Sequence, residues 1–381
     1  MQPSESLLKT VTCPAQAVCG GCTYLGLPLG DQIQSKIDDL TARLERQGLS
    51  FPSIEVLIPG THGLRDRLDF TLEEGRFGLM RKSERQIEDL SECSQLSPPL
   101  AAWLQTFRQR LPTVRKGSVR LRVAPDGTRG MWLDFSNIDI KGLLDEKKWL
   151  DQWGPEVRIE IGQRLKCPQR DSKDHWKLKD PSYYPWFSSQ WNGKTVELFG
   201  LIGGFTQPGL LPNQLITSWI QAATLRLSPR RITEFGSGQG NLSFPALSSF
   251  AELTACESDE LALKGFRLSL ENFKAKEGHD LTPFVKIEAA DFLRQSSPSL
   301  RDADLLIANP PRSGLQAFLE PLTKGTSLRD ILYMSCYAES FTEDSKKLRL
   351  SGFHLRRLAI LDQFPQTKHY EIISEWSRSS E

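Results

Sequence analysis

The sequence predicts an α/β fold, in which a Rossmann-like domain with an open, mostly parallel sheet follows a smaller α+β domain. Three observations predict it. From residue 214 onward, amphipathic helices alternate with short apolar strands. A glycine-rich turn at 236–240 joins a buried strand to a helix. The last two strands, 355–364 and 370–376, are separated by a few residues including Pro365, and so short a link forces antiparallel pairing.

The length of 381 residues is enough for two domains, each with its own core. We expect the boundary between residues 190 and 191, with helix 31–48 packing on the second domain. The formal net charge of +1 indicates no particular partner. No apolar run approaches a membrane span of ~18 residues and no signal pattern begins the chain, so we expect a cytoplasmic protein without a membrane partner.

Three cysteines stand close together near the N-terminus, at Cys13, Cys19 and Cys22. The Gly-Gly pair before Cys22 lets the sulfurs turn toward one centre, and Cys93 is the natural fourth ligand. Four thiolates suit a tetrahedral zinc ion or an iron–sulfur cluster. Zinc sites more often use two close Cys-x-x-Cys pairs, so a triplet with one distant cysteine favours the cluster. A set of unligated thiols is the alternative.

Two segments of the first domain carry features of nucleic-acid binding. Residues 93–125 contain no acidic residue but include several arginines, which gives either a phosphate-binding face or an ordinary solvated one. Residues 164–191 interleave aromatic and basic side chains. Such residues stack on single-stranded bases and contact phosphates, but a packing seam between elements would also collect aromatics. Both interpretations remain open for each segment.

The glycine turn is the most informative part of the second domain. Gly236, Gly238 and Gly240 let the backbone approach a ligand closely. Glu257 follows Gly238 by nineteen residues at the end of the next strand, where a Rossmann-type fold holds the hydroxyls of a ribose. A glycine turn also occurs in other α/β proteins, so this pattern alone is weak. A parallel sheet that ends in an antiparallel pair is the outline of a methyltransferase dependent on S-adenosylmethionine, rather than of a dehydrogenase.

Three segments fall at the sheet edge formed by the carboxyl ends of the parallel strands, where ligands bind in such sheets. Asn309-Pro-Pro-Arg312 and Ser335-Cys336 each follow a strand, and His369-Tyr-Glu371 opens the last, antiparallel one. Arg312 replaces the aromatic residue that stacks on the base in many amine methyltransferases, which argues against amine methylation. A thiolate that adds to C6 of a pyrimidine activates C5, and a base must then remove the C5 proton. Cys336 and Glu371 fit these roles by position; a core thiol and a surface acid are the alternatives.

Together these segments resemble the RNA uracil-C5 methyltransferase family, whose bacterial members modify 23S rRNA or tRNA. The resemblance runs from Cys13 to about Trp376 and keeps four specific parts in order, namely the four cysteines, Asn309-Pro-Pro-Arg312, Ser335-Cys336 and residues 364–371.

The resemblance implies a [4Fe-4S] cluster on the four cysteines of an RNA-recognition domain at 1–190, and a catalytic domain at 191–381. It implies that Cys336 is the nucleophile and Glu371 the proton acceptor. Contacts to S-adenosyl-L-methionine would come from Gln207, Gly236, Gly238, Glu257 and Asn309, with Asp291 less securely near the adenine.

The chain departs from the family at Tyr337 and Gly209, where asparagine is usual. Only twelve residues precede Cys13, so we expect no N-terminal RNA-binding barrel, which favours the shorter type that modifies rRNA. The predicted function is C5 methylation of a flipped uridine in 23S rRNA by a monomer with no DNA partner. The alternatives are methylation of the tRNA T-loop uridine and a catalytically silent RNA-binding homologue.

Overall fold

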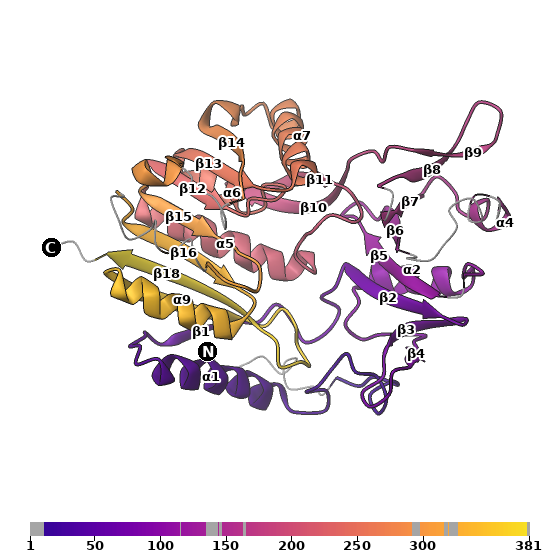
Figure 1. The fold of residues 1–381 in the computed structure, drawn as a ribbon, viewed down its shortest axis with the longest axis horizontal. Coiled ribbons are helices and arrows are strands. Elements are labelled where there is room, and N and C mark those ends of the chain that lie inside the picture. Colours follow the sequence, from indigo (N-terminus) through magenta and orange to yellow (C-terminus); the bar gives the residue numbers. More distant parts are fainter. Residues whose placement is uncertain are drawn as a thin grey trace. The chain divides into compact units, whose positions relative to one another are not determined.

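The computed structural model describes residues 11–114, 116–134, 144, 147–162, 165–291, 298–315, 319 and 327–378 (Figure 1). They form two compact units, each with its own large sheet. The first unit is drawn from the chain up to Leu29, from Gly60–Phe187 and from Leu201–Leu210. The second takes Gly30–Pro59, Ser188–Gly200 and the chain from Leu211 onward. Residues 30–59, which the sequence analysis placed before the boundary, therefore belong to the second unit.

The first unit is built on a six-stranded sheet with the order β4-β3-β2-β5-β6-β7. All described pairs are antiparallel except β6 with β7. Helix α2 (Pro98–Arg108) begins with two prolines, which fit the first turn of a helix, and buries Trp103 and Phe107 in the core of the sheet. The strands are β2 (Arg67–Glu73), β3 (Arg76–Met80), β4 (Ile87–Asp89), β5 (Lys116–Val123), β6 (Arg129–Asp134) and β7 (Val157–Ile161), with α4 (Lys147–Leu150) and the pair β8 (Cys167–Arg170) and β9 (Trp176–Lys179) beside them.

Three basic residues of the window, Arg108, Lys116 and Arg120, are neutralised by acids on strands β2 and β4. Antiparallel pairing sets Asp69 opposite Arg120 and Glu73 opposite Lys116, and both pairs form ion pairs. Arg108 forms a bidentate ion pair with Asp89. These acidic partners lie 19 to 51 residues before the basic residues in the chain, so the composition of the window does not reveal them. Arg115 lies outside the described residues.

The aromatic segment serves mainly as packing. Trp186, Phe187 and Trp191 are buried, while Trp176 stacks under Arg170. Three of its cations are engaged with acids in the pairs Lys166–Asp180, Lys177–Asp171 and Arg170–Asp151. Of the two interpretations left open by the sequence, the structure supports packing for these residues; Arg164 lies outside the described part of the chain.

The second unit holds an eight-stranded sheet with the order β1-β17-β18-β16-β15-β12-β13-β14. Strand β18 runs antiparallel to both of its neighbours, which confirms the predicted antiparallel end of the chain. The other described pairs are parallel. The strands are β1 (Ile54–Leu57), β12 (Arg231–Phe235), β13 (Glu252–Glu257), β14 (Val285–Ala289), β15 (Leu305–Ala308), β16 (Asp330–Ser335), β17 (Phe353–Leu361) and β18 (Glu371–Arg378).

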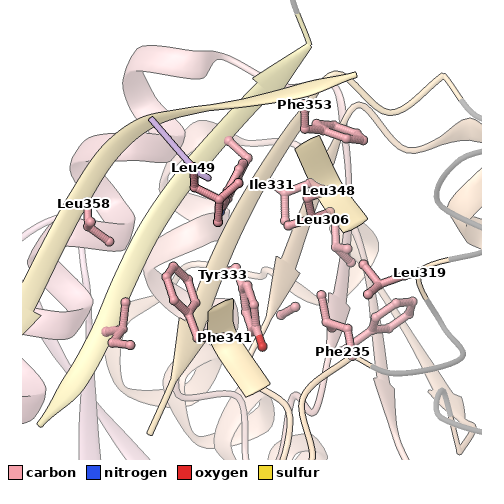
Figure 2. Packing of buried hydrophobic residues seen from close by; sticks show 14 of the residues in the cluster. Leu49, Phe235, Leu306, Leu319, Ile331, Tyr333, Phe341, Leu348, Phe353 and Leu358 are labelled. Carbon is pink, nitrogen blue, oxygen red and sulfur yellow. The ribbon is translucent and has the colours of Figure 1, made fainter. Parts of the chain in front are cut away.

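Helices and a large hydrophobic cluster on the sheet complete the described part of this unit. Figure 2 shows Phe235, Leu306 and Ile331 of the sheet gathered in one layer with Phe341 and Leu348 of α9. A separate two-stranded sheet precedes α5. The remaining elements are β10 (Tyr184–Trp191), β11 (Lys194–Gly200), α5 (Leu210–Leu227), α6 (Ser243–Ala246), η3 (Leu247–Ser249), α7 (Glu260–Glu277), η4 (Thr282–Phe284), η5 (Pro298–Asp302) and α9 (Ala338–Leu350). No helix in the described residues is long and apolar enough to span a membrane.

Helix α1 (Leu29–Arg46) is anchored to the turn between β17 and β18. Lys36 Nζ lies 2.6 Å from Asp362 in an ion pair whose side chains are fully buried. The Tyr370 hydroxyl donates to Asp39 at 2.7 Å. Residues 362 and 370 bracket the turn that leads into β18, so side chains one helical turn apart on α1 fix both of its ends. A further pair joins Gln32 to Gln366.

The segment Leu201–Leu210 is held in the first unit by charged side chains. Buried Arg122 donates to the carbonyls of Ile202 and Leu201. Glu160 accepts from the backbone N–H of Ile202 at 2.9 Å, and Asp66 accepts from that of Leu210 at 2.8 Å. These bonds satisfy backbone groups that a buried irregular segment would otherwise leave unpaired.

Gly209 ends this segment and leaves no room for a side chain. A Cβ atom there would lie 1.7 Å from the carbonyl oxygen of Leu64. We therefore expect Gly209→Asn, which restores the residue usual in the family, to lower the free energy of unfolding by about 3 kcal/mol, as severe overpacking does. Denaturant melts measure this. Gly30→Asn is the control, because a Cβ there meets nothing within 4 Å; equal effects of the two substitutions would contradict the expectation.

Candidate functional site

The carboxyl ends of the parallel strands of the second unit form one edge of its sheet. The chain leaves β12 toward β13 in one direction, and β15 and β16 lie on the other side of β12. This reversal is the point at which open α/β sheets bind ligands. The residues predicted at strand ends (Gly236, Glu257, Asp291, Asn309 and Cys336) all follow or terminate strands at this edge.

The glycine turn has the backbone that the sequence predicted. Gly236, Gly238 and Gly240 all have positive φ, at 72°, 55° and 91°, where side chains are disfavoured. A Cβ on Gly238 would meet nothing within 4 Å, whereas one on Gly240 would strike the ring of Phe266. Gly238 therefore presents open backbone of the kind a nucleoside cofactor can approach, while Gly240 permits helix packing.

Glu257 lies directly beside this turn. One carboxylate oxygen accepts from the N–H of Gly238 at 3.1 Å, and the other accepts from the N–H groups of Ser258 and Asp259 at 2.7 and 2.9 Å. These donors fix the carboxylate at the end of β13. A carboxylate oxygen has lone pairs beyond those used here, so it can also accept from the hydroxyls of a ribose.

Glu234 was missed by the sequence analysis, although it stands two residues before Gly236. It is buried, and the Ser243 hydroxyl donates to it at 2.5 Å. Burial raises the pKa of Glu234 to about 7, the Ser243 hydrogen bond lowers it, and the nearby Glu257 raises it. The Glu234–Ser243 bond ties β12 to the first residue of α6 across the glycine turn. An acid just before the glycine turn was the available signal.

Cys336 and Glu371 are brought together by antiparallel pairing. Ser335, the last residue of β16, pairs with Ile372 of β18, so Cys336 follows one strand where Glu371 begins the other. Burial and then the charge of Glu371 raise the pKa of Cys336, while Arg312 lowers it through its charge and a hydrogen bond to the thiol. Arg312 thus joins the pair from the loop after β15, a role that the sequence analysis did not assign.

Glu371 is almost completely buried, with 3% of its surface exposed. Burial raises its pKa to about 8, opposed by a hydrogen bond from Gln363. The donor is Gln363 Nε2, at 2.7 Å. A carboxyl group with a raised pKa and a thiol beside it form the kind of arrangement that proton transfer and nucleophilic catalysis need. Nothing in the sequence singled out Gln363, because its role depends on how the turn folds back.

The other predicted cofactor residues are placed as follows. Asn309 comes directly after β15, and its N–H donates to the carbonyl of Phe235. Asp291 lies two residues after β14. Gln207 is buried in the segment Leu201–Leu210 of the first unit. Its contact with the cofactor stays a prediction.

The four cysteines lie near one another in the first unit. Burial raises the pKa of Cys22 to about 12, followed by the charges of Cys93, Cys19 and Cys13. The Gly20 N–H donates to the Met80 carbonyl at 2.9 Å, which fixes the Gly-Gly turn against β3. Over the described chain, no group of three or more His, Cys, Asp or Glu side chains is arranged to hold a metal ion.

Tyr337, the departure next to the predicted nucleophile Cys336, is 43% exposed. Its backbone N–H and carbonyl both hydrogen bond to the Ser335 hydroxyl. The side chain is therefore presented from a fixed backbone, and the substitution of tyrosine for asparagine removes none of the chemical groups of the Cys336–Glu371 pair.

Comparison with known proteins gives one coherent set of relatives. The family model described as tRNA (Uracil-5-)-methyltransferase matches residues 191–374. An uncharacterized RNA methyltransferase of Bdellovibrio bacteriovorus is 42% identical, over 96% of this chain and 95% of its own. The 23S rRNA (uracil(1939)-C(5))-methyltransferase of Neisseria lactamica is 25% identical, over 93% of this chain and 79% of its own.

A solved structure has the same fold. The tRNA (uracil-54, C5)-methyltransferase of Pyrococcus abyssi, in complex with S-adenosyl-L-homocysteine, matches 96% of this chain and 87% of its own. The TM-score is 0.68 at 17% sequence identity. The likeness confirms the α/β methyltransferase fold predicted from the sequence.

Proposed function

The chain belongs to the RNA uracil-C5 methyltransferase family, and on this premise we propose that it methylates C5 of a uridine in 23S rRNA. The observation that carries the proposal is the meeting of Cys336 and Glu371 at the sheet edge that also holds the glycine turn. The choice of 23S rRNA is supported by two relatives that are 25% identical over 93% of the chain and are named for that substrate.

In the proposed mechanism the Cys336 thiolate adds to C6 of a flipped uracil and forms a C6–S bond. The displaced electron pair makes C5 enolate-like and nucleophilic. S-adenosylmethionine, when bound, supplies the electrophilic methyl group. The open backbone at Gly238 and the carboxylate of Glu257 fit its nucleoside, with Gly236 and Asn309 as further contacts.

Elimination returns the enzyme to its starting state. The carboxylate of Glu371 takes the proton from C5, the C–H electron pair re-forms the C5–C6 double bond, and the C6–S bond breaks to release the thiolate. Arg312, which contacts the thiol, favours the thiolate at both ends of this cycle because a cation stabilises a neighbouring anion.

Methyl transfer onto rRNA isolated from cells that lack this gene tests the proposal. With tritiated S-adenosylmethionine and purified protein, we expect label in 23S rRNA as 5-methyluridine, located by nuclease digestion and mass spectrometry. Label confined to tRNA would correct the target to a tRNA uridine. No transfer to either RNA would leave a silent RNA-binding homologue and overturn the proposed activity.

We also propose that Cys13, Cys19, Cys22 and Cys93 hold a [4Fe-4S] cluster. Burial, and then the charges of other thiols of the set, raise the pKa of Cys19, Cys22 and Cys93, so the four side chains lie close to one another. Four neighbouring thiolates are what a [4Fe-4S] cluster requires. The reaction has no redox step, so the cluster would be structural or would position RNA.

Iron analysis tests the cluster. Protein purified without oxygen is expected to be brown and to contain about four irons per chain, the content of a [4Fe-4S] cluster. Cys93→Ser should lose most of this iron. Cys167→Ser is the matched control, since Cys167 belongs to the same unit but not to the set. A colourless protein with one zinc ion would overturn the assignment.

A further inference from the structure

The side chain of Gln363 is buried beside Glu371, and only one of its two polar atoms has a hydrogen-bond partner among the described residues. Only 2% of Gln363 is exposed. Its Nε2 donates to Glu371 Oε2 at 2.7 Å, whereas its Oε1 is buried and has no hydrogen-bond partner within the part of the chain that the structure describes. Leaving a buried acceptor unpaired costs free energy, so a use for Oε1 in another state of the site is expected.

The proposed reaction gives Glu371 two protonation states with different hydrogen-bonding needs. Before C5 loses its proton, the Glu371 carboxylate is an acceptor and needs a donor. After it has taken the proton, the same group carries an O–H and needs an acceptor. A glutamine amide offers both, because rotation by about 180° about its last torsion exchanges Nε2 for Oε1.

We propose that Gln363 is a positioning residue that holds Glu371 in both protonation states of the reaction, by donating from Nε2 before proton removal and accepting at Oε1 afterwards. The inference rests on the proposed function, since it assigns Glu371 as the proton acceptor. Gln363 itself contacts neither RNA nor cofactor in this scheme, and it acts only through Glu371.

Gln363 is the neighbour of Glu371 whose hydrogen bond influences the pKa of this carboxyl group, so it is the residue that can hold Glu371 in both protonation states. Cys336 approaches from the end of β16, with Arg312 on its thiol. The buried Lys36–Asp362 pair lies next to Gln363 in the chain, and the same turn carries Lys368 and His369. Burial and the Gln363 hydrogen bond are the influences that set the pKa of Glu371, so loss of the amide should act directly on the carboxyl group.

Gln363→Met tests the proposal, because it keeps the length of the side chain and removes both amide functions. The substrate is an RNA transcript that accepts methyl groups in the assay above, carrying tritium at C5 of its uridines. Release of tritium into water reports proton removal, and denaturing gels report the covalent RNA adduct. Once Cys336 is bonded to C6 its own titration no longer contributes, so the pH dependence of adduct decay reports Glu371.

We expect methyl transfer to the adduct to change less than about 2-fold in Gln363→Met, and adduct decay to slow about 10-fold near neutral pH. The pH midpoint of decay should rise by about one unit, since the carboxylate has lost a stabilising donor. Gln363→Glu places a second carboxyl group there and should raise the midpoint further. Rescue by Gln363→His, which retains one donor and one acceptor, would bring the midpoint back toward that of the unmodified protein.

Gln366→Met is the matched control. Gln366 lies in the same turn and is equally buried, but its amide contacts Gln32 of α1 rather than Glu371. Its substitution should leave the pH midpoint in place. An unchanged midpoint and decay rate in Gln363→Met, or the same shift in Gln366→Met, would overturn the proposal. Failure of the unmodified protein to form an adduct would instead overturn the proposed function.

Discussion

Cys336→Ala is expected to abolish the covalent complex with RNA that contains 5-fluorouridine. In the unmodified protein the thiolate adds to C6 and C5 is methylated, but the C–F bond cannot be broken by proton removal, so the complex persists. Without the thiol neither addition nor trapping can occur, and methylation of normal RNA should fall by at least about 10³-fold, as expected when a nucleophile is removed. Denaturing gels with labelled RNA measure the complex.

A control distinguishes loss of chemistry from loss of structure. Cys256 is a fully buried thiol near the end of β13 in the same sheet, and Cys256→Ala should still trap RNA, although its stability will be lower. Trapping by Cys336→Ala equal to that of the unmodified protein would remove Cys336 from the mechanism and reduce the enzymatic scheme to fold resemblance.

Glu371→Gln is expected to show the opposite behaviour, an accumulation of adduct on ordinary RNA. Addition and methyl transfer need no proton acceptor at residue 371, whereas elimination does. Turnover should therefore drop by about 10² to 10⁴-fold, the range for loss of a general base, while one methyl group per chain is still transferred and remains covalently attached. A single-turnover experiment with tritiated S-adenosylmethionine and gel analysis measures both quantities.

Glu375 provides the matched substitution on the same strand. It is also buried, and it pairs with Arg226 instead of facing the thiol. Glu375→Gln should lower the free energy of unfolding without accumulating adduct. If Glu371→Gln turns over RNA at the rate of the unmodified protein, another group must remove the proton.

Much of the catalytic unit was predictable from local patterns. Hydrophobic periodicity predicted the alternation of helices and strands after residue 214, and the short link around Pro365 predicted the antiparallel strands β17 and β18. The glycine turn was predictable because positive φ requires glycine. These features depend on residues close together in the chain, where steric rules act directly.

What the sequence could not supply depends on contacts between distant residues. The acids that pair with Lys116 and Arg120 of the basic window come from a neighbouring strand and are brought there by the register of strand pairing. A count of charges along the sequence cannot reveal this register. Gln363 became visible only because the turn folds its amide onto Glu371. Helix 31–48 was expected to pack on the second domain, but the contacts of Lys36, Asp39 and Glu55 that hold α1 and β1 there were not, because their partners lie more than 300 residues later in the chain.

The anchoring of α1 and β1 has a consequence for how this enzyme can be dissected. A fragment starting near residue 191, the beginning of the family match, would contain both Cys336 and Glu371. It would nevertheless lack β1, leaving the hydrogen-bonding edge of β17 bare and prone to self-association. Asp362 would also become a buried anion without its lysine. The smallest independently folding form of the second unit must therefore include residues 30–59, and joining them to the C-terminus is a better route to it than truncation.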